Sequence, residues 1–166
     1  MTDNLITLIN QYKQAGILID TNILLLLFVG NADPKKIQLF KRTAQFAPED
    51  HALLSKLLSY FARIVSTPNI LSEVSSLSGQ LGEPFKREFF VSFSKEIELV
   101  DERYIRSIDV ARMDEFAKFG LTDSATIDLS NQRFLVLTDD FRLSQYLSRN
   151  NIDAINFNHI RVPGWT

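Results

Sequence analysis

In Ile17-Leu18-Ile19-Asp20-Thr21-Asn22, a short apolar run ends at a carboxylate. Phe134-Leu135-Val136-Leu137-Thr138-Asp139-Asp140 follows the same plan near the other end of the chain. A short apolar run bounded by polar residues is typical of a buried strand. A carboxylate beside such a strand is costly to bury unless another group pairs with it. The two stretches therefore predict buried strands that each end at a polar site.

Strand and helix signals alternate along the rest of the chain. Further strands are expected at 63–66, 97–100 and 154–157. Helices are expected at 21–29, from 33 to about 48, at 49–61, from Thr67-Pro68 onward, from Glu83-Pro84 onward, at 103–118, at 122–131 and at 139–149. This alternation predicts an α/β fold, a three-layer α/β/α sandwich around a parallel sheet of four or five strands.

The bulk properties fit a single domain and exclude several function classes. The 166 residues are expected to form one domain, 1–166, with a helical insertion at about 34–61. The chain has no cysteine and only two histidines, which excludes thiolate chemistry and leaves a serine-hydrolase triad without a well-placed base. Its net charge of -2 confines any nucleic-acid contact to local patches.

No membrane segment is expected. The longest apolar run, 23–29, has seven residues, whereas a transmembrane helix needs about 20. A signal peptide at the N-terminus is disfavoured because Asp3 and Asp20 interrupt the charged-then-apolar layout that export requires. The expected location is the cytoplasm.

Acidic residues mark the expected functional site. They are Asp20, Glu73, Asp123 and the pair Asp139-Asp140, each near a short apolar run or a helix start. Taken singly, each has a structural explanation, because acids near helix starts interact favourably with the helix dipole. Taken together, they are expected to converge at the carboxyl ends of the parallel strands, where ligands bind in such sheets. Converging carboxylates repel one another unless a cation holds them, and oxygen ligands suit Mg²⁺, which activates water for phosphodiester hydrolysis.

Four segments of the chain resemble the signature segments of PIN domains. They are Ile17-Leu18-Ile19-Asp20-Thr21-Asn22, Asn69-Ile70-Leu71-Ser72-Glu73-Val74, Gly120-Leu121-Thr122-Asp123-Ser124-Ala125 and Val136-Leu137-Thr138-Asp139-Asp140-Phe141, in the family's order. The resemblance runs from about residue 17 to 157. It implies a small α/β/α nuclease that cuts RNA with Mg²⁺ or Mn²⁺. Many members are toxins of toxin–antitoxin pairs, so an antitoxin partner and a homodimer are also implied.

The resemblance assigns roles to individual residues. Asp20, Glu73, Asp123 and Asp140 match the catalytic and metal-binding acids, while Asp139 is adjacent to the fourth position and is an alternative ligand. Supporting polar positions are matched by Asn22 and Thr138. The stretch between the first two acids is longer than in compact toxins, which weakens the toxin assignment more than the nuclease assignment.

Two other functions compete with the nuclease. A phosphohydrolase could use Asp20 as a covalent nucleophile, but that chemistry commonly places a second aspartate where this chain has Asn22. A PIN-like module without catalysis could bind RNA or a protein. Apolar stripes at 53–61 and 85–93 are read as core, with a partner groove and a base-stacking surface as the respective alternatives.

Overall fold

A five-stranded parallel sheet forms the centre of the protein. The computed structural model describes residues 3–131 and 133–161. The strands are β1 (Ile17–Ile19), β2 (Ile64–Ser66), β3 (Val100–Glu102), β4 (Leu135–Thr138) and β5 (Ala154–Asn156), arranged in the order β3-β2-β1-β4-β5. Ile17 of β1 pairs with Ile64 on one side and with Leu135 on the other.

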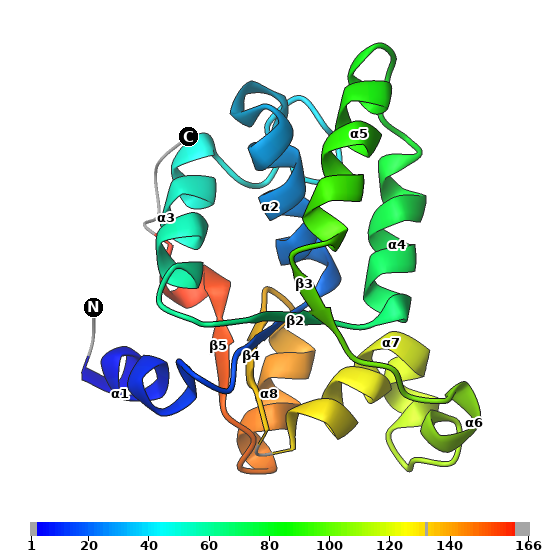
Figure 1. Cartoon of the computed structure of the whole chain (residues 1–166). Coiled ribbons are helices and arrows are strands. Elements are labelled where there is room, and N and C mark those ends of the chain that lie inside the picture. Colours follow the sequence, from blue (N-terminus) through cyan, green and yellow to red (C-terminus); the bar gives the residue numbers. More distant parts are fainter. Residues whose placement is uncertain (1–2, 132, 162–166) are drawn as a thin grey trace.

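Helices cover both faces of the sheet (Figure 1). One layer holds α2 (Thr21–Ala32), α3 (Pro48–Leu58), α4 (Pro68–Ser78) and α5 (Phe85–Ile97), and the other holds α6 (Ser107–Val110), α7 (Phe116–Ser130) and α8 (Phe141–Arg149). The remaining elements are α1 (Asp3–Tyr12) and two short 3₁₀ helices, η1 (Pro34–Lys36) and η2 (Phe157–His159). The predicted three-layer α/β/α sandwich is confirmed.

The apolar run at 23–29 lies in α2, which is buried on all sides. Every residue of this run is at most 5% exposed, and α2 packs against α3, α4 and α5. A helix that is apolar all round is stable in water only when neighbouring helices enclose it. In the described part of the chain, no helix is long and apolar enough to span a membrane.

Several local predictions are confirmed. The Thr67 hydroxyl accepts a hydrogen bond from the amide of Ile70 (3.2 Å), with Pro68 in the first turn of α4. On α5, the rings of Phe85, Phe89 and Phe93 face the core and are buried. The stripe at 85–93 is therefore mainly core, as predicted.

The predicted helix from 33 to about 48 is wrong. Only η1 is helical there, and the chain then runs through a series of turns to α3. The buried side chains are Ile37, Phe40, Thr43 and Phe46, a spacing of three residues. Turns closed by i to i+3 hydrogen bonds produce that period, and the Thr43 hydroxyl donates to the carbonyl of Ile37 (2.7 Å).

Two other boundaries differ from the sequence prediction. β3 begins at Val100, where the expected strand was to end, and 97 is the last residue of α5. The expected helix at 103–118 is broken, because only 107–110 and the start of α7 are helical. Gly120 has a positive φ of 75° and forms a kink inside α7, two residues after the predicted end of that helix.

Candidate functional site

The acids lie where the order in which the chain adds strands to the sheet reverses. From β1 the chain builds β2 and β3 on one side and then crosses to β4 and β5 on the other. This reversal leaves a crevice beyond the carboxyl ends of β1 and β4, which is where open parallel sheets bind ligands. Asp20 directly follows β1, and Asp139 and Asp140 directly follow β4.

Asp20 is a buried carboxylate held by two hydrogen bonds. It is the N-cap of α2 and is 8% exposed. Its Oδ1 accepts from the amide of Thr21 (2.7 Å), and its Oδ2 accepts from the hydroxyl of Thr138 (2.6 Å). Burial is the main cause that raises the pKa of Asp20 to about 6; the two hydrogen bonds oppose this rise, and the nearby charges of Asp139 and Asp140 contribute to it.

Glu73 lies on α4 and joins three helices. Its Oε2 accepts from the hydroxyl of Thr21 on α2 (2.7 Å), and its Oε1 accepts from the hydroxyl of Thr122 on α7. Both carboxylate oxygens are therefore occupied by short hydrogen bonds. This arrangement fixes the Glu73 carboxylate beside the N-terminus of α2.

Asp123 follows the kink in α7 and faces the other acids. Burial raises its pKa to about 7, and the charges of Asp20, Asp140 and Glu73 each contribute to this rise. A groove of about 550 Å³ opens here, lined by Asn69, Ser72, Glu73, Asp123 and the 119–122 stretch. The charges of three carboxylates from other elements thus act on the Asp123 carboxyl at this place.

Asp139 and Asp140 have different surroundings. One oxygen of Asp140, Oδ1, caps α8 by accepting from the amides of Arg142 (2.7 Å) and Leu143 (3.0 Å). Asp139 accepts from the side-chain amides of Asn22 (3.2 Å) and Gln45 (3.1 Å). The Asp139 pKa is raised, mainly by burial.

The acids fit a cation bound through few protein ligands. Among the described residues, no group of three or more His, Asp or Glu side chains is placed to hold a metal ion. Magnesium usually keeps several waters and binds one or two carboxylates together with substrate phosphate. Asp20 and Asp123 are the acids that could hold such an ion, and burial, with a further contribution from neighbouring carboxylates, raises the pKa of each.

The supporting residues differ in part from the sequence interpretation. Thr138 holds Asp20, as its position suggests. Asn22, the other expected supporting residue, donates its side-chain amide to Asp139. The hydroxyl of Thr122, which precedes Asp123 in the chain, donates to Glu73. Sequence reasoning did not identify Gln45, because a contact across 94 positions leaves no local signal.

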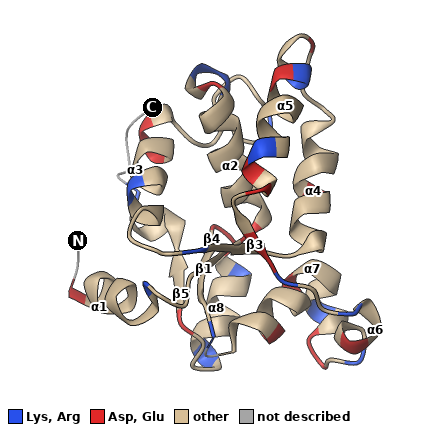
Figure 2. Cartoon of the chain, in the orientation of Figure 1, with Lys and Arg blue, Asp and Glu red and all other residues tan. Residues whose placement is uncertain are grey.

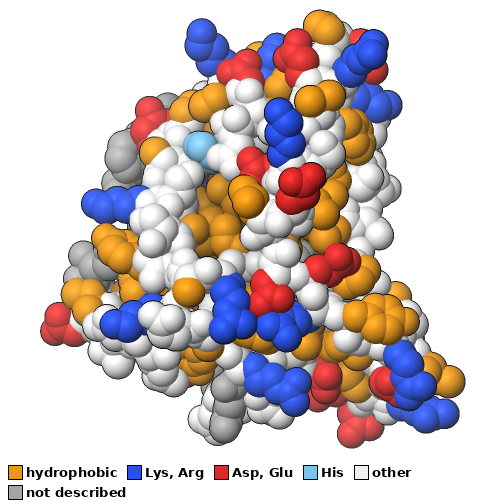
Figure 3. All heavy atoms as spheres, viewed as in Figure 1, with side chains coloured by type: hydrophobic (Ala, Val, Ile, Leu, Met, Phe, Trp, Pro, Cys, Tyr) orange, Lys and Arg blue, Asp and Glu red, His pale blue; other side chains and the backbone are white. Residues whose placement is uncertain are grey.

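A second hollow lies away from the acids. Figure 3 shows it between α3 and α5, with hydrophobic side chains on its floor. It has a volume of about 410 Å³ and includes Leu27, Leu58 and Leu99 in its lining. Its other lining residues include Arg63, Ile64 and Val100 at the amino ends of β2 and β3, whereas the acids lie beyond the carboxyl ends of the strands.

Comparison of the chain with protein-family models, with curated proteins and with solved structures gives no match.

Proposed function

We propose that this protein is an endoribonuclease that hydrolyses RNA phosphodiester bonds with Mg²⁺ or Mn²⁺. One observation carries the proposal: Asp20 and Asp139-Asp140 follow neighbouring strands at one edge of the sheet, and the charges of Asp20, Asp140 and Glu73 add to the rise, to about 7, that burial produces in the pKa of Asp123. Uncompensated negative charge in a crevice favours binding of a divalent cation. The resemblance of the same four segments to PIN domains supports the assignment.

Each acid has a part in the proposed reaction. Asp20 and Asp123 would hold the cation, Asp140 would contribute its second oxygen, and Glu73 would orient the site through the two threonine hydroxyls. A bound divalent ion supplies charge stabilisation at the phosphate and activates a water for in-line attack. Thr138 keeps the Asp20 carboxylate in place through its hydroxyl and also accepts from the amide of Asp140 (2.9 Å).

The groove beside Asp123 carries cationic groups that suit a phosphate backbone. The Lys118 ammonium lies 4.9 Å from the centre of the Phe119 ring, and the Arg142 guanidinium lies 5.3 Å from the same ring. Phe119 lines the groove next to Asp123. Elsewhere, acidic and basic side chains are interspersed over the chain (Figure 2). Local cations of this kind position a nucleic acid through its phosphates.

The proposal extends to partners through the family resemblance. A toxin of this kind would act on cellular RNA and would be restrained by an antitoxin protein. A homodimer is the corresponding assembly. Co-expression with the product of a neighbouring short reading frame would test this part, since an antitoxin is expected to bind the chain and suppress its RNA cleavage.

RNA cleavage is the experiment that tests the function. Purified protein is incubated with a mixed single-stranded RNA pool and Mg²⁺ or Mn²⁺, beside Asp20→Asn and a chelator control. The matched control is Asp128→Asn, which removes an exposed carboxylate from the same helix as Asp123. We expect cleavage by the wild type and Asp128→Asn only. RNA binding without metal-dependent cleavage would instead favour a non-catalytic binding module.

A further inference from the structure

Asp139 is held by side-chain amides from three separate segments of the chain. Its Oδ1 accepts from Nδ2 of Asn22 on α2 (3.2 Å), and its Oδ2 accepts from Nε2 of Gln45 in the turns before α3 (3.1 Å). Its backbone carbonyl accepts from Nδ2 of Asn158 on η2 (3.0 Å). Among the ion pairs of the described residues, none includes Asp139. Neutral donors therefore fix this carboxylate without compensating its charge.

The Asp139 carboxylate lies close to Asp20. The residue before Asp139 is Thr138, whose hydroxyl donates to Oδ2 of Asp20 (2.6 Å). Asn22, a donor to Asp139, lies two residues after Asp20 at the start of α2. Burial is the main cause of the raised pKa of Asp20, and the charge of Asp139 contributes to it. A cation held by Asp20 would therefore also be attracted by Asp139.

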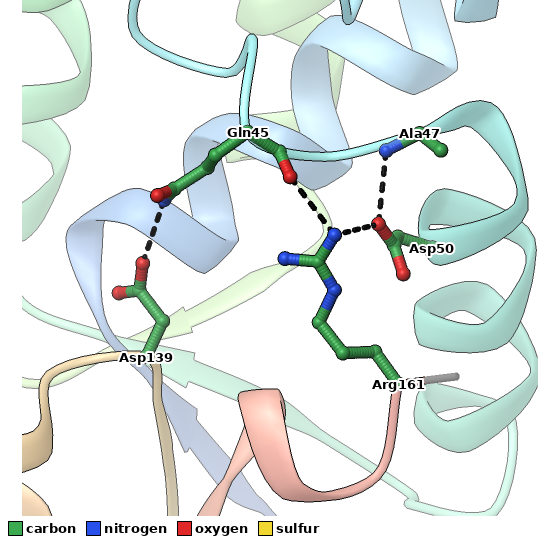
Figure 4. Close-up of polar contacts among 5 residues, drawn as sticks. All are labelled: Gln45, Ala47, Asp50, Asp139 and Arg161. Carbon is green, nitrogen blue, oxygen red and sulfur yellow. Dashed lines mark hydrogen bonds and ion pairs between the residues drawn. The ribbon is translucent and has the colours of Figure 1, made fainter. Parts of the chain in front are cut away.

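The Gln45 side chain is presented by a firmly fixed segment (Figure 4). Nη2 of Arg161 donates to the carbonyl of Gln45 (2.8 Å) and lies 2.8 Å from Oδ2 of Asp50, a fully buried carboxylate. That same Oδ2 accepts from the amide of Ala47 (2.9 Å). Because solvent screens a buried ion pair only weakly, this pair sets the backbone position from which Gln45 reaches Asp139.

The contact between Gln45 and Asp139 is of the kind that orients a metal ligand. Carboxylates that bind metal ions are themselves hydrogen-bonded by outer residues, which fix their direction. Amide N–H groups that donate to a carboxylate also favour its ionised form, which is the form that binds a cation. The Gln45 side chain is exposed, so its contact with Asp139 adds little to the packing of the core.

We propose that Gln45 positions the Asp139 carboxylate toward the divalent cation that Asp20 would hold. This inference rests on the proposed ribonuclease function. Gln45 is not itself a ligand, because its amide N–H restricts the direction of Oδ2 of Asp139. The ion pair of Arg161 with Asp50 keeps the Gln45 backbone where this contact forms. Without the N–H donor, the Asp139 carboxylate is free to turn into solvent, and cation binding weakens.

Isothermal titration calorimetry with Mn²⁺ tests this role independently of catalysis. Gln45→Met keeps the length of the side chain and removes its donor, so it should raise the Kd for Mn²⁺ roughly tenfold. In protein that already carries Asp139→Ala, the same substitution should have no further effect, because the carboxylate that Gln45 holds is gone. Gln38→Met, at an exposed glutamine of the same segment, is the matched control and should leave the Kd unchanged.

Urea unfolding with a chelator separates positioning from a structural role. Because Gln45 is exposed, the unfolding midpoint of Gln45→Met should equal that of Gln38→Met. A fall in this midpoint that parallels the fall in Mn²⁺ affinity would refute the inference, since Gln45 would then support the fold rather than the site.

The remaining outcomes distinguish the inference from the proposed function. If Gln45→Met binds Mn²⁺ as tightly as Gln38→Met, or weakens binding equally with and without the Asp139 carboxylate, the positioning role is refuted. RNA cleavage by the wild type in that case leaves the ribonuclease intact. If the wild type neither binds Mn²⁺ nor cleaves RNA, both proposals fail.

Discussion

Replacing Asp123 with asparagine should stabilise the metal-free protein above neutral pH. The pKa of Asp123 is raised from 3.8 to about 7 in the folded state, first by burial and then by Asp20, Asp140 and Glu73. The folded protein therefore binds this proton more tightly than the unfolded chain does. The resulting stability is fully present below pH 3.8 and is lost as the pH rises through about 7. An asparagine does not ionise and avoids this loss.

The magnitude follows from the two pKa values. Their gap, at about 1.4 kcal/mol per unit, gives a ceiling of about 4 kcal/mol. Asp123 is only partly buried, and screening by solvent reduces the effect to about 1–2 kcal/mol. For a protein of this size, that corresponds to a rise in melting temperature of roughly 3–6 °C.

Urea unfolding between pH 4 and pH 9 in the presence of a chelator measures this effect. The stability difference between Asp123→Asn and wild type should nearly vanish at the acid end, grow as the pH rises to about 7 and level off above it. Asp128→Asn, at an exposed position of the same helix, should show no such growth. A difference that is independent of pH, or a variant less stable than wild type at pH 9, would refute the charge repulsion inferred among the acids.

Two further substitutions test the packing around the site and the central helix. Arg161→Ala leaves the buried Asp50 carboxylate without its cation. Urea unfolding should therefore show that the free energy of unfolding falls by about 3 kcal/mol. A fall below about 1 kcal/mol would mean that solvent reaches Asp50. Gly30→Ala should destabilise by about 1–3 kcal/mol, because the new Cβ would lie 2.2 Å from the His51 ring. The expected clash would be contradicted if Gly30→Ala raised the free energy of unfolding by about 1 kcal/mol, which is the change that helix propensity alone predicts.

Most of the sheet could be predicted because its strands are short, apolar and bounded by polar residues. β1 and β4 are entirely buried, so their sequences carry a clear signal. β3 is an edge strand that reads Val100-Asp101-Glu102, and its position was wrong by three residues. Its exposed edge allows polar residues, which remove the pattern that identifies a strand.

The helices that were mispredicted lie where tertiary packing overrides local spacing. Ile37 and Phe40 fit a helical period as well as a three-residue period, and only the burial of Thr43 and Phe46 distinguishes the two. Helix α1 was not predicted, because its apolar face is small: only Leu5, Ile9 and Tyr12 are buried, and they join the hydrophobic core.

The positions of the acids could be predicted, but their hydrogen bonds could not. Parallel strands bring their carboxyl ends to one edge, so the order of segments alone placed Asp20 beside Asp139-Asp140. The choice of Asp139 as the partner of Asn22 depends on side-chain direction at the start of α2. The contribution of Gln45 depends on the Arg161–Asp50 ion pair, whose members are far apart in the sequence.

Direct binding of Mn²⁺ tests the central claim, which is that the acids at the switch point form one divalent-cation site. Electron paramagnetic resonance of free Mn²⁺ during titration with protein gives the amount bound without depending on catalysis. We predict saturable binding to wild type and Asp128→Asn, and binding weakened at least tenfold in Asp20→Asn, because a charged ligand is lost. Equal binding by wild type and Asp20→Asn, or no binding by wild type, would contradict it.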